Sequence, residues 1–188
     1  MGWKHGFRKS GTAKPTYKGV EFDSLDEIHL YKWLEIAVKY GLIEGFYYHP
    51  DSVKVIPEYN IQYEEKKQLK TKVKTIHRTK TVFRAVTYTA DFLLYGVSEC
   101  LKPYFEISAD GFYWCDCKST FMDTGESKYF SLLRKVLWYV KQIHLNKVVP
   151  VDLFHKTYCP DNVRYGVSGK ELKAYKGCPT INNFMKGD

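Results

Sequence analysis

The stretch from Val86 to Thr120 constrains the fold most, because it contains two apolar runs, VTYTADFLLY and FEISADGFYWCDCKST, that have the composition of buried strands. Within the runs, Asp91 and Asp116 occupy positions where a buried strand rarely carries charge. A buried carboxylate is costly unless it is paired or binds a metal. The two runs therefore predict buried strands whose aspartates are paired with a cationic side chain or bind a metal ion.

Asp116 is followed two residues later by Lys118. Side chains alternate between the two faces of a strand, so we expect Asp116 and Lys118 to lie side by side. With Asp91 entering from a neighbouring strand, these groups would form a site for a divalent cation such as Mg²⁺ beside a phosphate. The alternative is a solvated cross-strand ion pair, because this triplet is common. The opposite face would carry Tyr113, Cys115 and Cys117.

Length and composition indicate one domain with a sizeable core. The net charge of +8 favours a polyanionic partner, with nucleic acid first. Five cysteines, an odd number without zinc-site spacing, indicate reduced thiols. No apolar run is long enough to cross a bilayer, and the N-terminus lacks the apolar core of a signal peptide. We expect a cytoplasmic protein with no membrane partner.

The first part of the chain predicts a basic mobile arm over residues 1–19, followed by a single domain over residues 20–188. A helix is expected from Asp23 to near Gly41, because apolar residues recur at helical spacing. Glu27 lies on this apolar stripe. Ser24 and Glu27 can form a capping box; if Asp23 caps instead, Glu27 faces the sheet, and the local pattern leaves both open.

A basic tract predicts a β-ribbon over residues 64–84. Between Lys66 and Arg84 the chain has eight lysines and arginines and no acid. A ribbon of this composition presents a cationic face to a phosphate backbone, although a solvated edge strand guarded by lysines is the alternative. The residues expected to contact DNA are Lys70, Lys72, Lys74, Arg78, Lys80 and Arg84.

After the second acid, Ser127 is expected to cap a helix, and the apolar run from Val148 to His155 is expected to be a buried strand. Residues 156–188 form a turn-rich extension with short helices near residues 170–175 and after Pro179. No histidine metal site and no Ser-His-Asp triad is assigned. These elements predict an α/β fold with a central mixed β-sheet flanked by helices. The apolar positions expected to pack inward on the helix are Leu132, Leu133, Val136, Leu137, Val140 and Ile143.

The order of helix with Glu, strand with Asp, and strand with Asp-x-Lys resembles the PD-(D/E)xK nuclease superfamily over about residues 24–155. The matching residues are Glu27 in SLDEI, Asp91 in YTADFLL, and Asp116 and Lys118 in CDCKS. Within the superfamily the chain looks most like small phage endonucleases that resolve Holliday junctions, through S-x-x-E, Y-T-x-D-F-L-L and KAYKGCPT. It differs from the common pattern by Ala90 in place of Pro and by Asp116 in place of Glu.

This resemblance implies a restriction-endonuclease-like core with an inserted basic β-ribbon. It also implies a homodimeric, Mg²⁺-dependent endodeoxyribonuclease that acts on duplex or branched DNA and accepts Mn²⁺, in the cytoplasm of a bacterial or phage-infected host cell. Glu27, Asp91, Asp116 and Lys118 would be catalytic. The metal would be held by Asp91, Asp116 and the backbone carbonyl of Cys117, with Glu27 joining directly or through water. Two alternatives are a non-catalytic nucleic-acid-binding protein on a nuclease-like scaffold and the nuclease subunit of a transposition or restriction system.

Overall fold

A mixed four-stranded sheet forms the centre of the protein. A computed structural model describes residues 13–120, 124–166 and 169–187. The strand order is β10-β9-β8-β3, with β10 parallel to β9 and the other neighbours antiparallel. This confirms the predicted α/β class and mixed sheet. The strands are β3 (Gly45–Tyr48), β8 (Phe92–Tyr95), β9 (Tyr113–Cys117) and β10 (Leu145–Val148).

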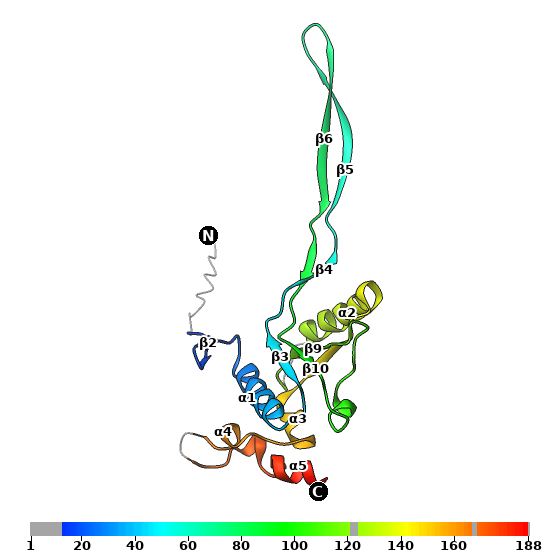
Figure 1. Cartoon of the computed structure of the whole chain (residues 1–188). Coiled ribbons are helices and arrows are strands. Elements are labelled where there is room, and N and C mark those ends of the chain that lie inside the picture. The colour runs from blue at the N-terminus through cyan, green and yellow to red at the C-terminus, as the bar shows by residue number, and fades with distance from the viewer. Residues whose placement is uncertain (1–12, 121–123, 167–168, 188) are drawn as a thin grey trace, which may run out of the picture.

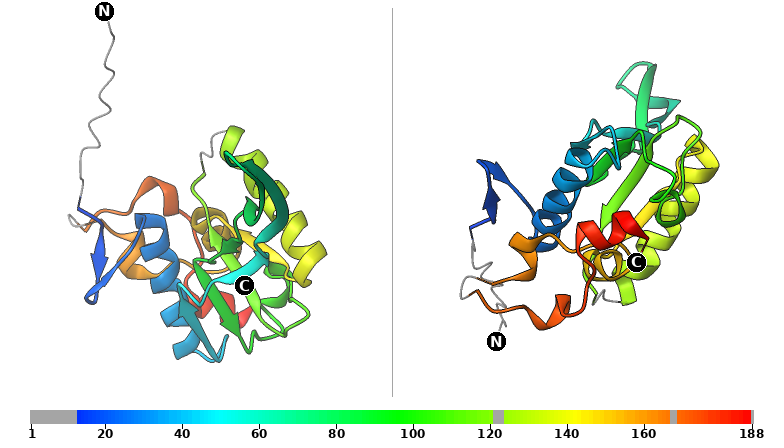
Figure 2. Two further views of the ribbon diagram at one scale, coloured as in Figure 1. Left: turned by 90° about the horizontal axis from the view of Figure 1, so that it is seen from above. Right: turned by 60° about the horizontal axis from the view of Figure 1, so that its bottom comes forward.

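Helices α1 (Leu25–Lys39) and α2 (Thr124–Lys141) cover opposite faces of the sheet (Figure 2). Successive strand residues point to opposite faces, so Phe92 packs in a cluster with Trp33 of α1, whereas Leu93 packs in a cluster with Leu137 of α2. Cys115 and Cys117 belong to the α1 side, and all the cysteines are free thiols, as expected. The sheet therefore has a buried core on each face.

Helix α2 differs in two ways from its expected form. It begins at Thr124, so Ser127 lies inside the helix and is not its cap. Leu137 and the following Ile143 are buried, but Leu132 and Val140 are 60% and 44% exposed. The apolar face of α2 is thus wider than the part of the helix that packs against the sheet, and its edges are exposed to solvent.

A long hairpin is inserted between the neighbouring strands β3 and β8, and Figure 1 shows that β5 and β6 project away from the sheet. The ladder of β5 with β6 covers residues 59–83. It therefore begins five residues before the predicted ribbon of residues 64–84 and ends one residue before it. Lys70 and Lys72 are not on a strand, because residues 69–72 form the turn, where the N–H of Leu69 donates to the carbonyl of Lys72 at 2.8 Å. The strands are β4 (Val53–Ile56), β5 (Tyr59–Gln68), β6 (Val73–Phe83) and β7 (Val86–Tyr88).

Part of the predicted mobile arm is structured. Residues 1–12 lie outside the described residues, but β1 (Thr16–Tyr17) and β2 (Val20–Glu21) form a small hairpin against α1. Lys18 forms an ion pair of 2.6 Å with Glu35 of α1, and Phe22 is fully buried. These contacts correct the expectation of a free arm up to residue 19.

The segment after β10 is a helix, which corrects the strand predicted from Val148 to His155. Pro150 is the first residue of α3 (Pro150–Lys156), a position where its fixed φ and missing N–H are tolerated, whereas it would interrupt a central strand. The remaining elements are η1 (Lys102–Tyr104), α4 (Asp161–Arg164), η2 (Lys173–Tyr175) and α5 (Ile181–Lys186).

The C-terminal extension packs into the same core as α1. Tyr158 and Tyr175 are buried, and the hydroxyl of Tyr158 donates to the carbonyl of Trp33 at 3.0 Å. Arg164 donates to the carbonyls of Cys178 and Pro179, both at 2.8 Å. The extension therefore stabilises the face of the sheet that α1 covers. In the described part of the chain, no helix has the length and apolar character needed to span a membrane.

Candidate active site

Asp91 and Asp116 stand opposite each other on neighbouring strands. Phe92 pairs with Cys115 in the antiparallel ladder of β8 and β9, so the next residue outward on β8 faces the next residue along β9. The Oδ2 of Asp91 accepts a hydrogen bond of 2.7 Å from the backbone N–H of Cys117. This bond fixes the first carboxylate against the strand that carries the second.

Asp116 is held by two side chains. Its Oδ2 forms an ion pair with the ammonium of Lys118, and its Oδ1 accepts a hydrogen bond of 2.8 Å from the hydroxyl of Tyr88. Asp116 is 5% exposed. Burial alone lowers the pKa of Lys118, but the hydrogen bond to Asp116 and its charge raise the pKa by more than burial lowers it. The net pKa is therefore raised, and the amine is charged at neutral pH. The pair therefore joins a buried carboxylate to a half-buried ammonium, unlike a solvated surface pair.

Glu27 both caps α1 and faces the sheet. Ser24 is the N-cap residue, and its side chain accepts the N–H of Glu27 at 3.2 Å while its hydroxyl donates to Oε1 at 2.9 Å. Oε2 accepts from the N–H of Asp23 at 3.1 Å and from the hydroxyl of Tyr48 on β3 at 2.9 Å. Ser24 is therefore the cap and Asp23 is not, yet Glu27 also reaches β3, which the sequence had linked only to a cap at Asp23. Glu27 is buried at the end of the sheet from which the aspartates also project.

The acids share one electrostatic environment. The pKa of Asp91 is raised to about 7, chiefly by burial and next by the charge of Asp116. The N–H of Cys117 opposes this rise, Glu27 adds to it, and Lys118 opposes it. Three carboxylates against one ammonium leave surplus negative charge in a partly buried site. Such a site fits a divalent cation, whose preferred ligands are carboxylate oxygens.

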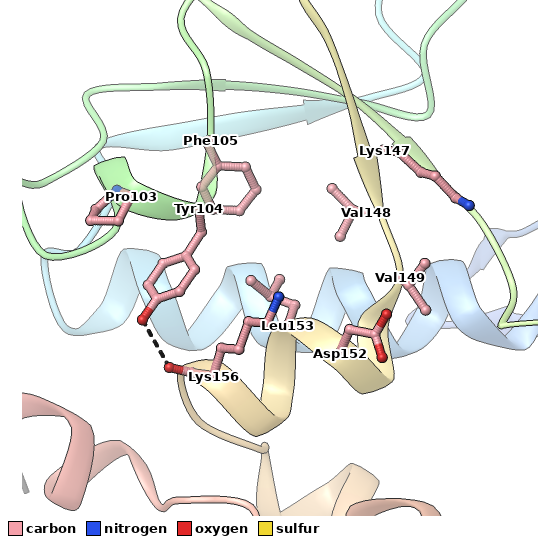
Figure 3. Close-up of a pocket in the computed structure, with 9 residues that line it drawn as sticks. All are labelled: Pro103, Tyr104, Phe105, Lys147, Val148, Val149, Asp152, Leu153 and Lys156. Atoms are coloured by element: carbon pink, nitrogen blue, oxygen red, sulfur yellow. Dashed lines mark hydrogen bonds between the residues drawn. The ribbon is translucent and has the colours of Figure 1, made fainter. Parts of the chain in front are cut away.

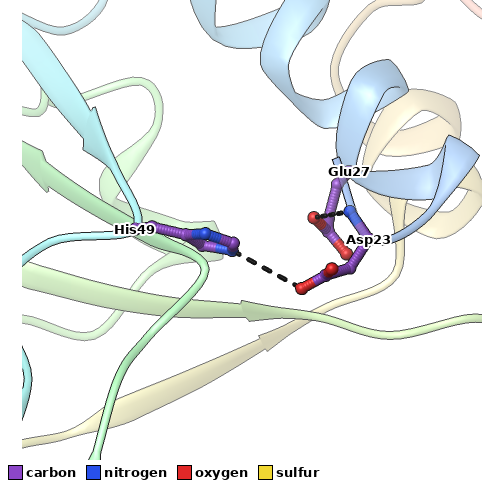
Figure 4. Close-up of side chains that lie close together, drawn as sticks. All are labelled: Asp23, Glu27 and His49. Atoms are coloured by element: carbon purple, nitrogen blue, oxygen red, sulfur yellow. Dashed lines mark hydrogen bonds and ion pairs between the residues drawn. The ribbon is translucent and has the colours of Figure 1, made fainter. Parts of the chain in front are cut away.

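The structure also gathers a set of side chains that the sequence did not predict. Asp23, Glu27 and His49 each offer one possible metal-ligand atom, and these atoms lie within 4.8 Å of one another (Figure 4). The Nε2 of His49 lies 3.9 Å from the Oδ2 of Asp23, and its backbone N–H donates to the carbonyl of Asp91 at 2.9 Å. Within the described part of the chain, Glu27, Asp91 and Asp116 do not meet the same 4.8 Å spacing.

His49 was missed because its position depends on strand pairing. It follows β3, whose Tyr48 pairs with Phe92, and only this register brings it beside Asp91. Its backbone has a left-handed φ of 46°, which is uncommon for a residue other than glycine. Neither feature can be inferred from the FYYHP segment itself.

Two hollows differ in their relation to these acids. One of about 420 Å³ is lined in part by Tyr48, His49 and Trp114, so it borders the acidic cluster. Another of about 350 Å³ lies between η1 and α3, with Asp152 and Lys156 in its lining (Figure 3). Neither hollow is lined by a predicted site residue, and the first meets the acidic cluster only through His49.

The predicted DNA-binding residues are only partly brought together. Lys74, Arg78 and Lys80 share one face of the ribbon, because alternate residues of β6 point the same way. Arg78 is not available as a free cation, since it forms an ion pair with Glu65 of β5. Lys70 and Lys72 lie in the turn, and Arg84 lies between β6 and β7. Lys74 therefore lies next to the turn, whereas Lys80 lies further along β6 toward the sheet. The hairpin that carries them projects away from the sheet (Figure 1).

Comparisons with protein-family models, with curated proteins and with solved structures give no match for this chain. The class of the protein is therefore described from its own fold and from the arrangement of its acidic and basic side chains. It is a mixed α/β protein with three carboxylates and a lysine at one end of its sheet and a long basic hairpin.

Proposed function

We propose that this protein is a metal-dependent DNA endonuclease that hydrolyses phosphodiester bonds, with a restriction-endonuclease-like core and a preference for branched DNA. The observation that carries the proposal is that Asp91, Asp116 and Lys118 meet where β8 begins and β9 ends, with Glu27 of α1 close enough to act on the charge of Asp91. Carboxylates and a lysine arranged in this way suit the hydrolysis of a phosphate ester with the help of a metal.

Asp91, Asp116 and the backbone carbonyl of Cys117 would hold Mg²⁺, and Glu27 would join them directly or through water. Mn²⁺ would substitute, because it accepts the same oxygen ligands. When bound, the ion supplies Lewis-acid stabilisation of the negative charge that develops on the phosphate. The surplus negative charge around Asp91 supports this assignment.

The side chains of the site have separate tasks in this proposal. Lys118 keeps its charge through its contact with Asp116, and its ammonium meets the phosphate as a compact point charge and orients the attacking water. Tyr88 and the N–H of Cys117 each hold one oxygen of an aspartate. They orient the carboxylates before substrate arrives, which lowers the cost of forming the reactive arrangement.

The hairpin would contact the DNA backbone. Lys74 and Lys80 on β6 and the lysines of the turn would bind phosphates on the outside of the substrate, in keeping with the net charge of +8. Cutting both strands of a junction requires two active sites, so we propose a homodimer. The alternative function, nucleic-acid binding without catalysis, rests on this same hairpin.

The test is cleavage of matched four-way junction, flap and linear duplex DNA with and without Mg²⁺. We expect metal-dependent cleavage that is fastest on branched DNA and that is lost in Asp91→Asn and Asp116→Asn. Asp152→Asn, which alters an exposed acid in the hollow beside α3, is the matched control and should cut like the parent. If no substrate is cut with Mg²⁺ or Mn²⁺, or if Asp116→Asn cuts as well as the parent, the endonuclease proposal is wrong. Salt-dependent binding without cleavage would then favour the alternative function.

A further inference from the structure

The outer surface of α2 combines exposed aromatic rings with positive charge. Tyr129, Trp138 and Tyr139 are 67%, 49% and 85% exposed. Between residues 128 and 141 the helix has four basic residues and no acid. Tyr129 lies nine residues before Trp138, about half a turn round the helix from it, so Trp138 is the ring that shares a surface with Arg134 and Lys135. Because the charge is of one sign, a polyanion with flat apolar groups is the partner whose chemistry matches this surface.

A hollow of about 450 Å³ opens beside this surface, between α2 and the segments that precede β9 and β10. Trp138 forms one wall, and Arg134 and Lys135 lie along the helix above it. Glu106 and His144 line the opposite side. A volume of this size suits a small ligand, such as a single nucleotide.

The side of the hollow that faces α2 is held rigidly by buried polar residues. The buried amide of Asn146 accepts from the N–H of Glu106 at 2.8 Å and donates to its carbonyl at 2.9 Å. The buried hydroxyl of Ser108 accepts from the N–H of His144 at 2.9 Å and donates to its carbonyl at 3.3 Å. Both lining residues are thus positioned before any ligand arrives, which reduces the ordering cost of binding.

A chain of contacts crosses the hollow. The imidazole of His144 lies 3.1 Å from a carboxylate oxygen of Glu106 and 3.2 Å from a guanidinium nitrogen of Arg134. Its ring is also in edge contact with Trp138, with centroids 6.3 Å apart. An aromatic wall, a cationic rim and an acceptor carboxylate therefore converge on one space. They match, in turn, the base plane, the phosphate and an exocyclic amine of a nucleotide.

The hollow is connected to the candidate active site through Phe130. The Nζ of Lys118 lies 5.5 Å from the centroid of this ring, and the guanidinium carbon of Arg134 lies 6.0 Å from it. The lysine of the acid cluster and the arginine of the hollow thus contact the same buried side chain. Both cationic groups therefore lie on the side of the sheet that α2 covers.

We infer that this hollow is a subsite for an unpaired nucleotide of single-stranded DNA, with Trp138 stacking on the base and Arg134 and Lys135 binding the phosphate. The inference rests on the proposed function, because it places the nucleotide in the strand that passes the Asp116–Lys118 pair. Glu106 accepts a hydrogen bond from the amine of the base, which favours cytosine over thymine. Substrates with unpaired nucleotides next to the cut, such as flaps and open junctions, are the class that fills this subsite.

Trp138 provides a direct signal for the test. Trp33 and Trp114 are buried, so in a Trp3→Phe background the exposed indole of Trp138 reports on the hollow. Titrating oligo(dC) without divalent metal should quench this fluorescence in a saturable way. Trp138→Ala or Arg134→Ala, followed by fluorescence anisotropy of labelled oligo(dC), should weaken binding about 5- to 150-fold. Tyr40→Ala, which removes an exposed aromatic ring at the end of α1, is the matched control and should bind like the parent.

Several outcomes separate this inference from the proposed function. If Trp138→Ala binds oligo(dC) like the parent while the parent cuts DNA, the subsite is wrong and the nuclease proposal stands. If oligo(dC) binds at Trp138 but no DNA is cut, the subsite stands and the nuclease proposal fails. Equal quenching by poly-glutamate or by blunt duplex DNA would overturn the assignment to single-stranded DNA.

Discussion

Replacing Asp91 by asparagine tests the electrostatics of the acid cluster while leaving an acceptor for the N–H of Cys117. The pKa of Asp91 is about 7 in the folded protein, against an ordinary value of 3.8. One pKa unit corresponds to about 1.4 kcal/mol. Ionised Asp91 therefore destabilises the metal-free native state by up to about 4 kcal/mol at about pH 8.

The sign of the pH dependence follows from the direction of this shift. Because the folded-state pKa lies above the unfolded value, the native state binds the proton more tightly, and the contribution of Asp91 to stability is lost as pH rises from about 4 to about 7. Asp91→Asn does not ionise. It should therefore equal the parent in free energy of unfolding below about pH 4 and exceed it by up to about 4 kcal/mol near pH 8.

Urea denaturation in EDTA, followed by tryptophan fluorescence, measures this difference. Added Mg²⁺ should then stabilise the parent at about pH 8 more than the variant, because ligand that binds only the native state adds to its stability. Asp152→Asn serves as the control for loss of an exposed acid. Equal stabilities of the parent and Asp91→Asn near pH 8 would refute the claim that burial and neighbouring carboxylates raise the pKa of Asp91.

Three further predictions concern the lysine, the ribbon and the core. Lys118→Met should reduce single-turnover cleavage by about 10²- to 10³-fold with little change in DNA affinity, because its charge acts on the reacting phosphate; unchanged cleavage would contradict its role. Lys74→Gln together with Lys80→Gln should weaken DNA binding and reduce the slope of log affinity against log salt by about one per lost phosphate contact; an unchanged slope would indicate solvated lysines. Trp33→Ala should lower the free energy of unfolding by about 3–5 kcal/mol, because this indole is fully buried and donates to Thr157 at 3.1 Å, and a loss below about 1 kcal/mol in urea denaturation would contradict this packing.

Strands β8 and β9 and helix α1 were predictable because their signals are local, whereas β10 was not predicted. Continuous apolar runs identify β8 and β9, and an apolar stripe at helical spacing identifies α1, although the choice between Asp23 and Ser24 as its cap stayed open. The segment after β10 was misread because VVPVDLFH is apolar throughout. Its composition suits either a strand or a buried helix, and the position of Pro150 at the first helical residue is what separates the two.

The site was predictable only as far as side-chain alternation reaches. The shared face of Asp116 and Lys118 follows from spacing, and their ion pair is present. The partners from other elements, Tyr48, Tyr88 and His49, depend on strand register and on the backbone after β3, which one sequence does not specify. The same limit applies to the ribbon, where a basic tract without acids meets glutamates of the opposite strand.

The position of a bound metal tests the central claim most directly. A crystal of the protein soaked in Mn²⁺ should give an anomalous difference peak between Asp91 and Asp116, and the same soak of Asp116→Asn should give a weaker peak or none. A peak at Asp23, Glu27 and His49 alone, or no peak near either aspartate, would contradict the proposal that Asp91 and Asp116 hold the metal of a nuclease.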